Sequence, residues 1–166
     1  MAVAEQVERE EMVVSRTFDA PRERVWRAWT EPELIKQWWG PKGFTAPVIE
    51  LDLRNGGKYL FNMRSPEGQD FWSAGVFKEV VKEERITVID SFADQEGNIV
   101  PASFYGLTGA WPLESEVTVT FEDLGGRARI IIRQPGIPAG EGVEVSSAGW
   151  KESLDKLAEL LRSMKG

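Results

Sequence analysis

The chain has 166 residues, the length of one domain, with 42% hydrophobic residues, 28% charged residues and a formal net charge of -7. This negative charge disfavours non-specific binding to nucleic acids and anionic membranes, because contacts with phosphate groups need clustered Lys and Arg side chains. The sequence contains neither Cys nor His, which excludes disulfides, thiolate nucleophiles, imidazole bases and metal sites with nitrogen or sulfur ligands, so we expect no metal and no cofactor.

The chain opens with a charged, aperiodic stretch. We expect residues 1–10 to form a flexible tail and residues 11–166 to form a single domain. Residues 12–18 are rich in β-formers and predict the first strand. No apolar run approaches the ~20 residues that cross a bilayer, and the N-terminus lacks the features of a secretory signal, so we expect a cytoplasmic protein with no membrane partner.

Two short helices are predicted next. Pro21 is well suited to the first turn of a helix, where its missing N–H costs nothing. Thr30 and Glu33 match a capping box, which predicts the start of a second helix. Gly40 is expected to end it.

The rest of the sequence predicts six strands, an irregular segment and a final helix. The strands are expected at residues 48–53, 58–64, 71–81, 85–93, 116–121 and 128–133. Residues 99–114 are interrupted by Pro and Gly and predict a long aromatic loop. The final helix has apolar residues at 3.6-residue spacing, namely Trp150, Leu154, Leu157, Leu161 and Met164. This order of elements predicts an α+β fold in which the helix covers one side of an antiparallel sheet.

Four motifs together resemble a known family. They are Phe18-Asp19-Ala20-Pro21 with Val25-Trp26, then Trp38-Trp39-Gly40-Pro41, then Gly56-Gly57-Lys58-Tyr59-Leu60-Phe61-Asn62-Met63, and finally Gly149-Trp150. The sequence resembles START-like proteins of the SRPBCC superfamily, and within it the bacterial branch named for the activator of the heat-shock chaperone ATPase, from about residue 13 to residue 161. The resemblance implies a helix-grip fold: a seven-stranded curved antiparallel sheet on a long C-terminal helix, with two short helices between strands 1 and 2. It also implies a cavity that often accepts hydrophobic small molecules.

The family name also implies a chaperone partner. The eukaryotic activators carry a separate N-terminal domain, whereas about ten residues precede the first expected strand here, so we expect a chaperone partner to be disfavoured. Many bacterial members carry a His in the loop that corresponds to Phe104-Tyr105-Gly106, and this sequence has none. Functions that need this imidazole are therefore not expected.

Aromatic residues are the candidates for ligand binding, with core packing as the alternative for most of them. Tyr59, Phe61 and Met63 share one face of a strand by alternation, and Phe77 and Phe92 are expected to join them. Rings in the 99–114 loop could form a lid over a cavity or pack on the loop itself. The predicted ligand-binding residues are Trp39, Tyr59, Phe61, Met63, Phe77, Phe92, Phe104, Tyr105, Trp111 and Trp150.

Catalytic candidates are few. Asp90 is in phase with Phe92, and Glu79 is in phase with Phe77, so both carboxylates are expected to point inward. Such a pair could act as acid and base without a His, with Tyr105 assisting. A strand-end carboxylate that reaches water is the alternative for Asp90.

Three functions stay open from the sequence. The first is a non-catalytic binding protein for a small hydrophobic molecule. The second is an enzyme similar to polyketide cyclases and aromatases that uses the inward carboxylates. The third is a protein-interaction module that acts on a chaperone or forms a homodimer.

Overall fold

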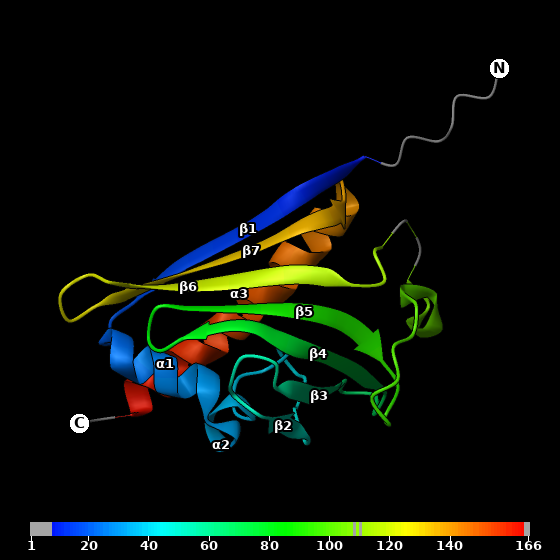
Figure 1. Ribbon diagram of the computed structural model, residues 1–166. Coiled ribbons are helices and arrows are strands. Elements are labelled where there is room, and N and C mark those ends of the chain that lie inside the picture. The colour runs from blue at the N-terminus through cyan, green and yellow to red at the C-terminus, as the bar shows by residue number, and fades with distance from the viewer. Residues whose placement is uncertain (1–7, 108, 110, 165–166) are drawn as a thin grey trace.

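The computed structural model describes residues 8–107, 109 and 111–164, and in them a seven-stranded antiparallel sheet curves along a long C-terminal helix (Figure 1). The elements in chain order are β1 (Arg9–Phe18), α1 (Arg22–Thr30), α2 (Pro32–Ile35), β2 (Ile49–Leu51), β3 (Lys58–Arg64), β4 (Asp70–Val81), β5 (Arg85–Ala93), a 3₁₀ helix η1 (Ala102–Tyr105), β6 (Ser115–Asp123), β7 (Ala128–Pro138) and α3 (Glu141–Ser163). The predicted α+β class and helix-grip architecture are confirmed.

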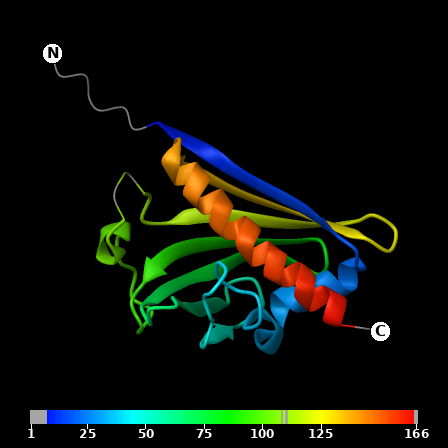
Figure 2. The same ribbon diagram turned by 180° about the vertical axis from the view of Figure 1, so that it is seen from behind.

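The sheet has the strand order β1-β7-β6-β5-β4-β3-β2. Strands β2 to β7 pair as consecutive neighbours, and β1 closes the row beside β7. Helix α3 runs diagonally behind the sheet in Figure 1, and Figure 2 shows it in front, with α1 and α2 beside its C-terminal end. The helices therefore cover one face of the sheet, and among the described residues no helix covers the other face.

The core lies between this inner face and the helices. Leu154, Leu157 and Leu161 of α3 are buried, as the apolar stripe predicts. Trp38 is fully buried, and its indole nitrogen donates to the carbonyl oxygen of Ala28 at 2.9 Å. Burying one such side chain contributes roughly 1.5–3 kcal/mol, and the hydrogen bond satisfies its only polar atom.

Two predicted boundaries at the N-terminal end are wrong. Strand β1 begins at Arg9, which pairs with Pro138, so the predicted tail of residues 1–10 overlaps the strand; residues 1–7 lie outside the described residues. The capping box at Thr30 does not form, because α1 continues through this residue and its hydroxyl donates to the carbonyl of Trp26 at 2.9 Å. A residue in helical conformation cannot act as an N-cap, which needs an extended backbone.

Strand β7 is longer than predicted and continues past Pro135. Its pairing with β6 stops at Arg133, while its pairing with β1 continues to Pro138. A Pro lacks the N–H that a central strand needs, so it is tolerated where one side of the strand has no partner. In the described part of the chain, no helix combines the length and hydropathy that a membrane span requires.

Candidate functional site

A cavity of about 160 Å³ lies between the inner face of the sheet and the helices. Strands β2 to β7 form one wall, and the helices with the turn after α2 form the other. A cavity of roughly this size accepts a molecule as large as benzene. The lining side chains are Trp29, Ile35, Trp38, Trp39, Leu51, Tyr59, Phe61, Phe77, Ile86, Val88, Asp90, Val117, Val119, Gln134 and Trp150.

The helical wall is built from four indoles in mutual contact, which we call the tryptophan cluster: Trp29, Trp38, Trp39 and Trp150. Trp29 stacks on Trp150 with ring centroids 5.8 Å apart and lies 4.7 Å from Trp38. Trp39 closes the circuit at 5.6 Å from Trp38 and 5.5 Å from Trp150. Because these rings come from α1, the turn after α2 and α3, the cluster ties the three helical segments into one apolar surface.

Lys156 holds the segment that follows Trp38 and Trp39 against α3. Its ammonium group donates to the backbone carbonyls of Gly40, Pro41 and Phe44 at 3.0 to 3.2 Å. Burial lowers the pKa of Lys156. An ammonium group has three donors, so these three carbonyls use all of them and fix the loop that follows Trp39.

The sheet wall contains a polar unit made by three neighbouring strands. Tyr59, Gly75 and Asp90 lie directly opposite one another on β3, β4 and β5. The hydroxyl of Tyr59 donates to a carboxylate oxygen of Asp90, so the phenol crosses the intervening strand. It can do so because Gly75 has no side chain: a Cβ there would lie 2.5 Å from the Tyr59 hydroxyl and would overlap the carbonyl of Ile89.

Asp90 has an unusual electrostatic environment. Burial raises its pKa from 3.8 to about 6, although hydrogen bonds from Tyr59 and from the backbone of Ser91 act in the opposite direction. Asp90 keeps part of its surface accessible and lines the cavity, so we assign that surface to the cavity. The pKa of Tyr59 is raised well above 10, first by burial and then by Asp90, so the phenol stays a neutral donor.

Half of the predicted ligand-binding residues line this cavity: Trp39, Tyr59, Phe61, Phe77 and Trp150. Their role in binding stays a prediction. Gln134 and the aliphatic side chains Leu51, Ile86, Val88, Val117 and Val119 were not predicted as site residues, and neither were Trp29, Ile35 and Trp38. The aliphatic set could have been found from strand alternation in register with Phe77, whereas Gln134 lies just beyond the predicted end of its strand.

The predicted residues Met63 and Phe92 do not line the cavity, and neither do the loop aromatics Phe104, Tyr105 and Trp111. Tyr105 instead anchors its loop to the sheet: its hydroxyl donates to the carbonyl of Ala93 and accepts from the backbone N–H of Trp72 at 3.1 Å. Its ring packs 5.0 Å from Phe104, 5.3 Å from Phe71 and 6.1 Å from Phe92, and the ring of Phe92 lies 6.5 Å from Trp111. Met63 lies beside Gly40. The described part of the loop therefore packs on the ends of β4 and β5, and Trp111 also packs against the buried core.

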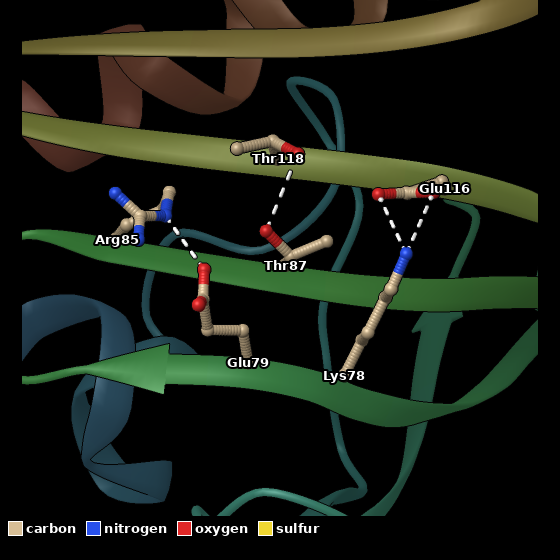
Figure 3. A network of polar contacts seen from close by, with 6 residues as sticks. All are labelled: Lys78, Glu79, Arg85, Thr87, Glu116 and Thr118. Carbon is tan, nitrogen blue, oxygen red and sulfur yellow. Dashed lines mark hydrogen bonds and ion pairs between the residues drawn. The ribbon is translucent and has the colours of Figure 1, made fainter.

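Glu79 does not point inward, and the predicted pair of inward carboxylates is wrong. A β-bulge lies between Phe77, which faces Val88, and Glu79, which faces Thr87. The extra residue changes the phase of the strand, so Glu79 reaches the outer face, where it accepts a hydrogen bond from Arg85 at 2.8 Å (Figure 3).

This outer face is polar around Glu79. Lys78 forms an ion pair with Glu116 at 3.3 Å, and the hydroxyls of Thr87 and Thr118 are 3.4 Å apart (Figure 3). The ion pair with Arg85 lowers the pKa of Glu79. Glu79 is thus half-exposed and charged, and it is separated from Asp90 by the sheet.

A metal centre is not indicated: among residues 8–107, 109 and 111–164, no group of three or more carboxylates could hold an ion. Besides the indoles, the polar groups that line the cavity among the described residues are the carboxyl group of Asp90, the phenol of Tyr59 and the amide of Gln134. Such an arrangement can bury an apolar molecule and can bind one polar group on it.

The sequence matches the family described as "Activator of Hsp90 ATPase homolog 1-like protein" over residues 19–162. No curated protein matches the chain. Among solved structures, a protein from Chromobacterium violaceum is 33% identical with a TM-score of 0.75, over 92% of this chain and 96% of its own. The AHSA1 protein from Silicibacter pomeroyi is 25% identical with a TM-score of 0.72, over 92% and 97%. A protein from Arthrobacter aurescens, 24% identical with a TM-score of 0.75 over 100% and 94%, shares the fold.

Proposed function

We propose, from the premise that the chain belongs to the Activator of Hsp90 ATPase homolog 1-like family, that the protein binds a small hydrophobic molecule between its sheet and its helices. The observation that carries this proposal is the cavity of about 160 Å³ with aromatic walls. Filling such a space with apolar atoms removes the ligand from water and adds dispersion contacts between the ligand and the aromatic walls.

The volume sets the size of the ligand. A single aromatic ring or a short aliphatic chain fits a cavity of this size, whereas a sterol or a long acyl chain needs several times more space. The tryptophan cluster favours flat ligands, because an aromatic ring can stack on or lie edge-on to the indoles.

Calorimetric titration with toluene tests the proposal. Val88→Phe adds a ring inside the cavity and should abolish the heat of binding, because the space is then occupied. Ile89→Phe is the matched control: the neighbouring residue points to the other face of the same strand and does not line the cavity. The proposal is wrong if toluene does not bind to the wild-type chain, or if both variants lose binding equally.

We propose a cyclase-like activity as a second candidate, because Asp90 carries a pKa of about 6 at the cavity. A carboxyl group with a pKa near the working pH is suited to general acid–base catalysis. The structure gives this chemistry one carboxyl group rather than the predicted two. Asp90→Asn should then abolish turnover of an added polyketide-like substrate that is short enough for the cavity, while binding of toluene is retained; turnover that is unchanged excludes this candidate.

A further inference from the structure

Most side chains that line the cavity are apolar, and Asp90 is its only charged side chain among the residues that the structure describes. Two hydrogen bonds reach its carboxylate, from Tyr59 and from the backbone of Ser91. A carboxylate has about four acceptor positions, so positions are left for a donor that approaches from the cavity.

The charge of Asp90 has no counter-charge within the described residues. The causes of its pKa shift are burial, Tyr59 and Ser91, and they include no Lys or Arg. A buried charge without a partner is costly, and charges in protein interiors are normally paired. Near neutral pH this carboxylate is mostly ionised, because its pKa of about 6 lies below 7.

The fold also fixes the position of the Asp90 carboxylate at the cavity. A Gly in the middle of a strand weakens it, because the residue adds backbone entropy and no side-chain packing. Gly75 nevertheless occupies the position between Tyr59 and Asp90, where any Cβ would displace the phenol. The backbone thus holds both polar groups in register at the cavity.

We propose, on the premise that the cavity binds a small hydrophobic molecule, that its ligands are small amines whose ammonium group pairs with Asp90 while the apolar part contacts the tryptophan cluster. An ammonium group supplies both the missing positive charge and the donors that the free acceptor positions take. The net charge of -7 further favours cations over anions.

Ligands with a negative charge fit this cavity less well. An anionic head group at this position would meet the charge of Asp90, and two like charges in a site of low dielectric repel each other strongly. The indole nitrogen of Trp29 is a donor without an acceptor among the described residues, but it is buried and therefore inaccessible to a ligand acceptor. Tyr59 already uses its hydroxyl proton for Asp90.

Titration calorimetry with benzylamine, toluene and benzoate tests the proposal, because the three share a ring and differ in charge. At pH 7.5 benzylamine should bind about ten- to a hundredfold more tightly than toluene, and benzoate should bind more weakly than toluene. In Asp90→Asn the preference for benzylamine should disappear while toluene binding is retained. Glu79→Gln is the matched control, because it changes the net charge equally but lies on the outer face.

The pH dependence of benzylamine binding gives an independent test. Tyr59 is the only other titratable group that lines the cavity within the described residues, and its pKa is raised well above 10. Benzylamine affinity should therefore rise about tenfold from pH 5 to pH 7.5 as Asp90 ionises. Toluene affinity should stay constant.

The outcomes separate the two proposals. Equal affinities for benzylamine and toluene, or equal losses in Asp90→Asn and Glu79→Gln, overturn the preference for amines but leave hydrophobic binding intact. If neither toluene nor benzylamine binds, both proposals fail.

Discussion

Replacing Asp90 by Asn should remove a part of the fold's stability that depends on pH, because the carboxyl group titrates and the amide does not. The pKa of Asp90 is raised from 3.8 to about 6, so the folded chain binds this proton more tightly than the unfolded chain. The resulting stabilisation is complete below pH 3.8 and is lost as the pH rises through about 6. The shift of about 2.2 pH units corresponds to about 3 kcal/mol in total.

The size of the effect over an accessible pH range follows from the same values. Between pH 4.5 and pH 7.5 the wild-type chain should lose about 2 kcal/mol of unfolding free energy through Asp90. Asn does not titrate, so the free-energy difference between variant and wild type should grow by this amount. Asp70, Asp94 and Asp155 have lowered pKa values and contribute with the opposite sign, but they are present in both proteins and cancel in the difference.

Urea unfolding followed by far-ultraviolet circular dichroism at the two pH values measures this difference. With a slope of about 2 kcal/mol per molar urea, the midpoint of Asp90→Asn relative to wild type should move by about 1 M between pH 4.5 and pH 7.5. A midpoint difference that does not depend on pH would refute the reasoning, because it would mean that the carboxylate is not desolvated in the folded chain.

Three further predictions concern the surroundings of the site. Lys156→Met leaves three backbone carbonyls without their donor and should lower the unfolding free energy by about 1–3 kcal/mol, whereas Lys151→Met, at an exposed position of the same helix, should leave the urea midpoint unchanged. Gly75→Ala should displace the phenol of Tyr59 and lower the unfolding free energy by about 1–3 kcal/mol, and loss of the tyrosine hydroxyl contact in nuclear magnetic resonance spectra would report the displacement; an unchanged spectrum would contradict it. Arg85→Ala should leave the urea midpoint unchanged, because its ion pair on the outer face is exposed to solvent, and a clear loss of stability would show that the pair is structural.

The strands of the sheet could be predicted because their inward residues alternate with polar ones between short turns. Lys58–Arg64 and Arg85–Ala93 form strands with the predicted bounds. The stripe on the last helix likewise predicted the burial of Leu154 and Leu157. These features follow from local periodicity, which the sequence displays directly.

The errors arose where one residue changes the phase or where a partner strand is missing. The bulge after Phe77 turned Glu79 outward, and period-two alternation has no means to place an inserted residue. Gln134 was missed because the predicted strand ends at residue 133, whereas β7 continues through Pro135 with a partner on one side only. Both errors affect the predicted site: the first placed the carboxylate of Glu79 in the cavity wall, where it does not lie, and the second left out the amide of Gln134, which lines the cavity.

The position of the aromatic loop could not be predicted from its composition. Rings in a loop need an apolar surface, but the sequence does not say which surface they reach. The hydroxyl of Tyr105 fixes the position of the loop, because it forms hydrogen bonds with the backbone of both Ala93 and Trp72. A long-range hydrogen bond between backbone and side chain of this kind leaves no local sequence signal.

The tryptophan cluster gives the protein an intrinsic fluorescence signal at the cavity. Its ring centroids are 4.7 to 5.8 Å apart, so excitation absorbed by one indole can migrate to the others before light is emitted. A ligand that quenches one indole would thus lower the fluorescence intensity of the whole tryptophan cluster. A ligand that alters the local polarity would shift the emission wavelength of the cluster. Occupancy can be followed by intrinsic fluorescence, without a dye or a label.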